Sequence, residues 1–161
     1  MAEKLTLKDT QPDMGATSEG VSLAVMDRLG LLPRKRGSTE SMHQVLLEFY
    51  ARAKKATAAK DPKLSVMTVD EMAIFAKITR QTMYEYLQRW LTLHIITKVS
   101  FIDEGGKVII GYKLNGTTIE DAFSKVETRI KKNVEDTKKL IVSLQKMLKN
   151  EKISASMKKD A

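Results

Sequence analysis

Apolar residues between Glu40 and Lys60 recur at steps of three and four residues. These positions are Met42, Val45, Leu46, Phe49, Tyr50 and Ala53. Such a stripe predicts an amphipathic helix, and Asp61-Pro62 should stop it because proline cannot continue a helix. The next apolar run, Leu64–Met67, is short, partly alternating and flanked by turn residues. We interpret it as a small strand.

Two short helices are predicted next. Thr68 followed by Glu71 has the spacing of a capping box, and the helix that it opens should span Val69–Ala76. Thr79 is the expected N-cap of a second helix, Thr79–Leu91. The apolar face of that helix consists of Met83, Leu87, Trp90 and Leu91. Because few residues separate the two helices, they predict a helix-turn-helix.

A β-hairpin should follow. Ile95–Ile102 and Lys107–Leu114 are rich in β-branched residues and alternate, and Asp103-Glu-Gly-Gly106 between them supplies residues that accept positive φ. Helix, small strand, helix, helix and hairpin is the order of a winged helix. The predicted fold class is therefore mainly α with a small β-hairpin, an α+β winged helix-turn-helix.

A long last helix is expected from Ile119 to about Asn150, after a cap at residues 115–118. Its apolar positions alternate steps of four and three, the spacing of a coiled-coil seam. We predict that it pairs with a second copy of the chain, because it is longer than the preceding domain can cover. The alternative is a helix folded back on its own domain. The predicted dimer contacts are Ile119, Phe123, Val126, Ile130, Val134, Leu140, Ile141, Leu144, Met147 and Leu148.

The first 39 residues differ in composition from the rest, with Gly, Ser, Thr, Asp and Pro dominating their first half. Within them, Ser22–Leu32 has helical spacing and could dock on the body or on a partner. The basic run Arg34, Lys35 and Arg36 is either an arm that follows the DNA backbone into a minor groove or a solvated linker. The predicted organisation is a flexible arm (1–39), a winged-helix DNA-binding domain (40–115), a dimerisation helix (116–150) and a frayed basic tail (151–161).

The net charge of the chain indicates the kind of partner that it binds. The 161 residues carry a formal charge of +8, which favours a polyanion because basic side chains near phosphates release condensed counterions. The chain has no cysteine, and His43 and His94 lie on separate segments, so we expect no disulfide and no metal site. With neither a secretory signal nor a membrane span expected, the predicted location is cytoplasmic and nucleoid-associated.

No enzymatic motif is recognisable. Gly-rich phosphate loops, GxSxG and HExxH are absent from the sequence. The adjacent carboxylates Asp70-Glu71 and Asp103-Glu104 are explained by a helix cap and a turn rather than by acid–base catalysis. We expect no catalytic residue and no cofactor.

The outer face of the Thr79–Leu91 helix carries side chains suited to base edges. Its candidate base contacts are Arg80, Gln81, Thr82, Tyr84 and Gln88. Arginine matches both major-groove acceptors of guanine, glutamine matches adenine, and a threonine methyl can contact the thymine methyl. The alternative is an ordinary solvated face, and Glu85 on this face would repel phosphate.

Candidate phosphate contacts surround this helix. They are Lys77, Arg89, Lys98, Lys107 and Lys113, together with the basic arm at 34–36. Contacts of this kind position a protein on DNA without selecting a sequence. The acidic hairpin tip at 103–104 argues against tight insertion into a minor groove.

The segment ITRQTMYEYLQRWLTLHIITK, residues 78–98, resembles a winged-helix signature. In that signature a small cap begins the recognition helix, a Leu-x-x-Leu pair follows (Leu87 and Trp90 here), and an Ile-Ile step (Ile95-Ile96) enters the wing. The whole plan resembles archaeal winged-helix transcription regulators of the Lrs-type biofilm and motility group, and more distantly PadR and MarR dimers. Two departures are His94, where the signature has glycine, and residues 1–39, which have no counterpart.

The resemblance implies a homodimeric, DNA-binding transcription regulator, whose two recognition helices would enter major grooves about 34–36 Å apart. Two other functions stay open. One is a nucleoid-coating protein with little sequence preference, and the other is a protein-interaction module in which the winged helix is only a scaffold. A Met- and Phe-lined space beside the long helix could also hold a small-molecule effector, which no residue pattern identifies.

Overall fold

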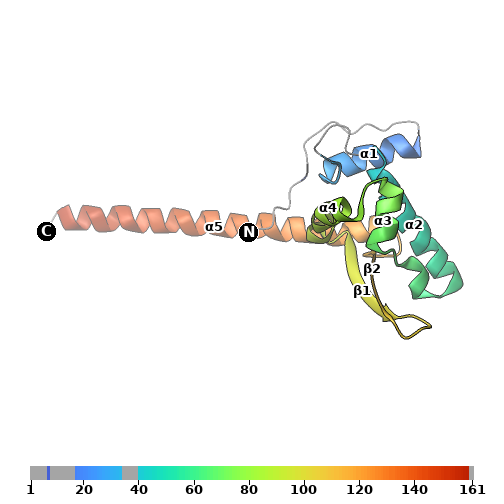
Figure 1. Ribbon diagram of the computed structural model, residues 1–161. Helices are drawn as coiled ribbons and strands as arrows, with labels where there is room; N and C mark the ends of the chain where they lie inside the picture. The colour runs from blue at the N-terminus through green and yellow to red at the C-terminus, as the bar shows by residue number, and fades with distance from the viewer. Residues whose placement is uncertain (1–6, 8–16, 34–39, 160–161) are drawn as a thin grey trace. The chain divides into compact units, whose positions relative to one another are not determined.

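The computed structural model describes residue 7, residues 17–33 and residues 40–159. These residues form five α-helices, one short 3-10 helix and one two-stranded antiparallel hairpin (Figure 1). The elements are α1 (Ser18–Arg28), α2 (Met42–Ala59), η1 (Pro62–Ser65), α3 (Val69–Ala76), α4 (Arg80–Leu93), β1 (Ile96–Ile102), β2 (Val108–Leu114) and α5 (Ile119–Lys159). The mainly helical α+β class is confirmed. The basic run at 34–36 lies outside the described residues.

The core is built around α2. Of its predicted stripe, Met42, Val45, Leu46, Phe49 and Ala53 are buried, whereas Tyr50 is half-buried. Phe49 packs on Trp90 of α4 with ring centroids 6.1 Å apart and planes inclined by 51°, a tilted geometry that aromatic pairs favour. The helix ends at Lys60 in the left-handed conformation, directly before Asp61-Pro62. The predicted helix and its stop are confirmed.

The segment predicted as a small strand, Leu64–Met67, is half helical: Leu64 and Ser65 belong to a 3-10 helix, whereas Val66 and Met67 are extended. Pro62–Ser65 forms the 3-10 helix η1, and the Asp61 carboxylate caps it by accepting a hydrogen bond from the Lys63 amide at 3.1 Å. Proline at the first position and an aspartate cap both favour a helical start, which outweighs the alternating pattern. Only Met67 pairs in extended form, through an isolated bridge to Tyr112 of β2.

The caps of α3 and α4 are those predicted. Thr68 and Glu71 form both hydrogen bonds of a capping box, and the Thr79 hydroxyl accepts from the Thr82 amide at 3.2 Å. Lys77 adopts the left-handed conformation that ends α3. Only residues 77–79 separate the helices, so the tight turn between α3 and α4 is confirmed.

The end of α4 differs slightly from the prediction. The helix continues to Leu93, which is buried, whereas Leu91 is only half-buried. His94 then takes a φ of 63°, the conformation that a glycine commonly supplies at a helix end. Its carbonyl accepts a hydrogen bond from the Asn115 side chain at 2.9 Å. The presence of histidine instead of glycine therefore leaves the sharp turn into β1 intact.

The hairpin has the predicted strands within one residue. β1 and β2 pair from Ile96–Leu114 at the base to Ile102–Val108 near the turn. In the turn, the Asp103 carboxylate accepts hydrogen bonds from the Gly105 and Lys107 amides. The acidic residue at the tip is thus used to fix the turn.

Gly111 is a position where the hairpin base approaches the preceding segment closely. A Cβ there would overlap Val66 Cγ1 and lie 3.2 Å from the Met67 carbonyl oxygen. Gly111→Ala should therefore lower the free energy of unfolding by about 1–3 kcal/mol, as overpacked sites do. Gly105→Ala is the matched control, because its new Cβ would meet only ordinary contact at 3.5 Å. Equal denaturation midpoints for the two variants would contradict this packing.

The chain separates into two compact units, one up to Val126 and the other from Glu127. The first turns of α5 belong to the first unit, where Ala122 and Val126 are completely buried. Val126 is therefore corrected from a dimer contact to a core residue. Ile119 and Phe123 are half-buried. Within the described residues no helix has the length and apolarity needed to cross a membrane.

Candidate nucleic-acid interface

Helix α4 has one buried and one exposed face. Met83, Leu87, Trp90 and Leu93 are buried, which fixes the orientation of the helix about its axis. Among the candidate base contacts, Arg80, Gln81, Tyr84 and Gln88 are exposed. Thr82 is half-buried, and its hydroxyl lies 2.8 Å from that of Thr79. Four of the five candidates therefore share the open face, while Thr82 is partly engaged in the cap.

Arg80 is the most constrained of these side chains. Its Nη2 donates to the Tyr84 hydroxyl at 3.3 Å, and its guanidinium carbon lies 5.6 Å from the centroid of the Tyr84 ring. Its Nε lies 3.5 Å from Oδ1 of Asp70 on α3. The hydrogen bond with Tyr84 and the charge of Asp70 raise the pKa of Arg80 above its ordinary value. The cation is thus held between two helices.

A groove separates this cluster from the hairpin. It has a volume of about 350 Å³ and is lined by Thr68, Val69, Asp70, Arg80, Tyr84, Lys98, Val108, Ile109, Ile110 and Tyr112. We call it the α4–hairpin groove. Burial, and to a lesser extent the neighbouring Tyr84, raises the pKa of Tyr112 above its ordinary value. Lys98 brings a candidate phosphate contact to the same groove as two candidate base contacts.

The hairpin side of the groove is more apolar than expected. Val108, Ile110 and Ile102 are each more than half exposed. They alternate onto the face that also carries Lys98, since Ile102 pairs with Val108 and Lys98 with Tyr112. This exposed aliphatic face is the observation that best suits a protein partner rather than DNA.

The candidate phosphate contacts do not form one surface. Lys77 is exposed at the turn before α4, and Lys107 is exposed at the hairpin turn. Lys98 and Lys113 project from opposite faces of the hairpin, because Lys113 follows Tyr112, the partner of Lys98. One flat contact with the groove face therefore cannot use both lysines.

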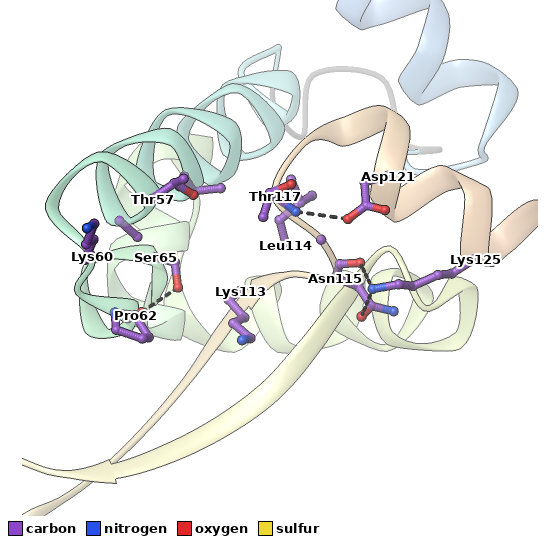
Figure 2. A pocket seen from close by; sticks show the side chains of 13 residues that line it. Thr57, Lys60, Pro62, Ser65, Lys113, Leu114, Asn115, Thr117, Asp121 and Lys125 are labelled. Atoms are coloured by element: carbon purple, nitrogen blue, oxygen red, sulfur yellow. Dashed lines mark hydrogen bonds between the residues drawn. The ribbon is translucent and has the colours of Figure 1, made fainter.

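Lys113 lines a different pocket, of about 550 Å³, at the end of β2. Figure 2 shows it there between the C-terminal end of α2 and the start of α5, with Lys60 and Lys125 among the lining residues. Lys125 donates to the Asn115 carbonyl at 2.6 Å, so part of this positive charge serves the turn that begins α5. Lys113 therefore lies outside the α4–hairpin groove.

Arg89 is placed differently from the prediction. It is half-buried, and its Nη2 donates at 3.2 Å to the carbonyl of Leu29, at the end of α1. Gly30 follows with a φ of 70°, and a Cβ there would lie 3.0 Å from Nη2 of Arg89. Arg89 therefore attaches α1 to the flank of α4, and it is removed from the candidate phosphate contacts.

Comparison with protein-family models, curated proteins and solved structures finds no match to this chain. Within the described residues, no group of three or more His, Asp or Glu side chains is placed to hold a metal ion.

Asp70 is the residue that sequence reasoning missed. An acidic residue in the first turn of a helix is favourable in itself, and this explains Asp70 in α3. The sequence alone therefore indicates no further role for Asp70. Its contact with Arg80 depends on how α3 packs against α4. An acidic and a basic residue ten positions apart, on separate helices, give no sequence signal of this contact.

An apolar pocket of about 370 Å³ lies beside the first turns of α5, where the sequence predicts space for a small-molecule effector. It is lined by Leu7, Val25, Arg28, Leu29, Leu46, Ile95, Ile119, Glu120 and Phe123. Its walls come from α1 and its C-cap, α2, Ile95 between α4 and β1, and the first turns of α5, together with Leu7. Phenylalanine lines it as expected, but the other apolar residues are leucine, isoleucine and valine rather than methionine.

Proposed function

We propose that this protein is a homodimeric winged-helix regulator of transcription that binds double-stranded DNA. The order of α2, α3, α4 and the β1–β2 hairpin supports the winged helix, with α4 as recognition helix and the hairpin as wing. In such domains the recognition helix enters the major groove with its N-terminal residues against the bases.

The observation that carries the proposal is the first two turns of α4. They expose Arg80, Gln81, Tyr84 and Gln88 while the opposite face of the same helix is buried. Arg80 offers two hydrogen-bond donors, which match the two acceptors of guanine. Gln81 offers one donor and one acceptor, which match the edge of adenine. A solvated face needs no such density of long polar and aromatic side chains.

Positive charge near this face supports contacts with the DNA backbone. Lys77 precedes α4, Lys98 lines the α4–hairpin groove and Lys107 lies at the turn of the wing. Each lies on a different segment around the recognition helix, as needed to follow a backbone on either side of a groove. The formal charge of +8 adds long-range attraction to the duplex.

The α5 stripe supports the dimer. We define it as Ile130, Val134, Thr137, Ile141, Leu144 and Leu148. These residues follow the alternating steps of four and three of a coiled-coil seam, and only Thr137 among them is polar. Val134, Ile141, Leu144 and Leu148 are each more than half exposed in the single chain, with Leu140 and Met147 on the flank. A second copy of the helix has the matching spacing.

A salt titration of duplex binding tests the proposed function. If Lys77, Lys98 and Lys107 each neutralise a phosphate in both protomers, the logarithm of the association constant should fall with the logarithm of salt concentration at a slope of about −5. Affinity should then drop roughly 10³-fold between 50 and 200 mM salt. Fluorescence anisotropy with labelled duplexes measures both quantities.

The result also separates the other functions. A steep slope with equal affinity for all sequences would support a nucleoid-coating protein. No binding to any duplex at low salt would contradict both DNA functions and leave the exposed aliphatic face of the wing as the basis for a protein-interaction module.

A further inference from the structure

The strongest unassigned feature is the acidic side chain beside the foremost candidate base contact. Asp70 lies in the first turn of α3, directly after the capping residue Thr68 and its neighbour Val69. Its Oδ1 is 3.5 Å from Nε of Arg80, and both side chains are more than 60% exposed. A carboxylate in this position is costly on a surface that only binds phosphate, because it repels the DNA backbone.

The contacts of Arg80 determine which of its donors remain available. A guanidinium has five N–H groups, one on Nε and two on each terminal nitrogen. Asp70 lies against Nε, and Tyr84 accepts from Nη2. The Nε edge faces Asp70 as an ion pair, and among the described residues both N–H groups on Nη1 and one on Nη2 have no hydrogen-bond partner. One from each terminal nitrogen forms a parallel fork at the end of the side chain.

That fork matches guanine. In the major groove guanine presents two acceptors, O6 and N7, and a bidentate arginine is their commonest protein partner. The Asp70 carboxylate also offsets the positive charge of Arg80, which weakens its attraction for phosphate without blocking the fork. The ring of Tyr84 supports one side of the guanidinium at a cation–π distance. The arrangement favours a neutral base edge over an anionic backbone.

We propose that Asp70 is a positioning residue that directs Arg80 to recognise one guanine in each half-site. This inference rests on the proposed function and names the base that its recognition helix selects. In this interface Arg80 would select a base, whereas Lys77, Lys98 and Lys107 would contact phosphates.

The test begins with a duplex selected from a random library by the full-length protein. Each guanine of the selected site is then replaced in turn by 7-deazaguanine, which lacks the N7 acceptor. Disruption of one bidentate pair should weaken binding of the natural protein about 5- to 150-fold at one symmetric pair of positions. If no 7-deazaguanine weakens binding of the natural protein, Arg80 does not recognise guanine and the inference is overturned without any variant.

Asp70→Asn then tests the role of the carboxylate. It should reduce the penalty of 7-deazaguanine at that position severalfold while affinity for unrelated duplexes stays equal or rises, because a negative charge has been removed near the backbone. Asp70→Glu keeps the charge and should restore most of the discrimination. Glu104→Gln at the wing tip is the matched control, since it removes the same charge from an exposed position away from Arg80.

The outcomes distinguish this inference from the proposed function. An unchanged 7-deazaguanine penalty in a folded Asp70→Asn protein would overturn the positioning role and leave DNA recognition by α4 intact. Thermal unfolding monitored by circular dichroism verifies the fold, and Asp70→Ser provides a second uncharged variant if the first unfolds. If the natural protein binds no duplex at low salt, the proposed function fails together with this inference.

Discussion

The double substitution Ile141→Asp and Leu148→Asp is expected to leave the protein monomeric at micromolar concentration. Both side chains are more than half exposed in the single chain and lie one heptad apart on the α5 stripe. Aspartates buried in the seam of two paired α5 helices would have to lose water without a compensating cation on the stripe, so the paired state becomes strongly unfavourable. Sedimentation velocity or light scattering measures the mass directly.

DNA binding should report the same change. A dimer that occupies two half-sites gains about 10²- to 10⁴-fold in affinity over a single module, because the second binding event is intramolecular. The monomeric variant should lose that factor on a two-fold symmetric site and nothing on an isolated half-site. Anisotropy titrations with the two duplexes give the comparison.

A matched control uses the opposite side of α5. Thr128→Asp combined with Asn150→Asp adds two aspartates to the same helix, at positions about half a turn away from the stripe. That variant should keep the dimer mass and the affinity for the symmetric site. A stripe variant that stays dimeric would show that the copies do not pair through α5, and a natural protein that is already monomeric would remove the dimer from the proposal.

The second large effect is expected from Arg80→Ala combined with Gln81→Ala. Each good bidentate base contact contributes about 1–3 kcal/mol of discrimination, so the pair should lower affinity for the selected site at least about tenfold per half-site. Binding to unrelated duplexes should change much less, because the backbone lysines remain. The measurement is the ratio of the two affinities at one fixed salt concentration.

Lys107→Ala provides the contrast. Removing this lysine from the turn of the wing should weaken binding to all duplexes alike and make the salt slope shallower by about 0.9 for each phosphate that is no longer neutralised. Arg80 and Gln81 would be reassigned to the DNA backbone if their removal had this uniform effect instead of lowering the ratio. If Arg80 and Gln81 contacted the backbone and Lys107 contacted a base, the Lys107 variant would lower the affinity ratio and the Arg80–Gln81 variant would lower all affinities alike.

Local signals are sufficient to predict most elements of this fold. The stripe of α2, the Thr68–Glu71 capping box and the Thr79 cap depend on residues within a few positions of each other, and each is formed as expected. The hairpin is equally local, because a glycine with positive φ and an alternating pattern define it. The exposed face of α4 is also predictable, because the apolar positions identify the buried face and the remaining residues must lie opposite it.

Contacts between elements are not predictable in the same way. In the sequence Arg89 resembles any exposed cation on a helix, yet the packing of α1 against α2 leaves the Leu29 carbonyl within hydrogen-bonding distance of Arg89. Val126 fits the spacing of a coiled-coil seam, but the first turns of α5 pack into the core. The approach of Asp70 to Arg80 depends on the angle between two helices. In each case the deciding contact is with a residue of a different element of the fold.

The isolated bridge between Met67 and Tyr112 has a mechanical consequence for the wing. At its base, β2 lies between β1 on one side and Met67 on the other. Toward the Ile102–Val108 pair, each strand is bonded only to the other strand of the hairpin among the described residues. The hairpin is therefore anchored to the domain through Tyr112 at its base, and this backbone pairing does not extend to its turn. Because bending of a strand pair held at one end increases toward the other end, we expect the turn at 103–107 to move more than Lys98, which pairs with Tyr112. If the hairpin contacts DNA as proposed, its turn would adapt to the backbone while Lys98 keeps its position.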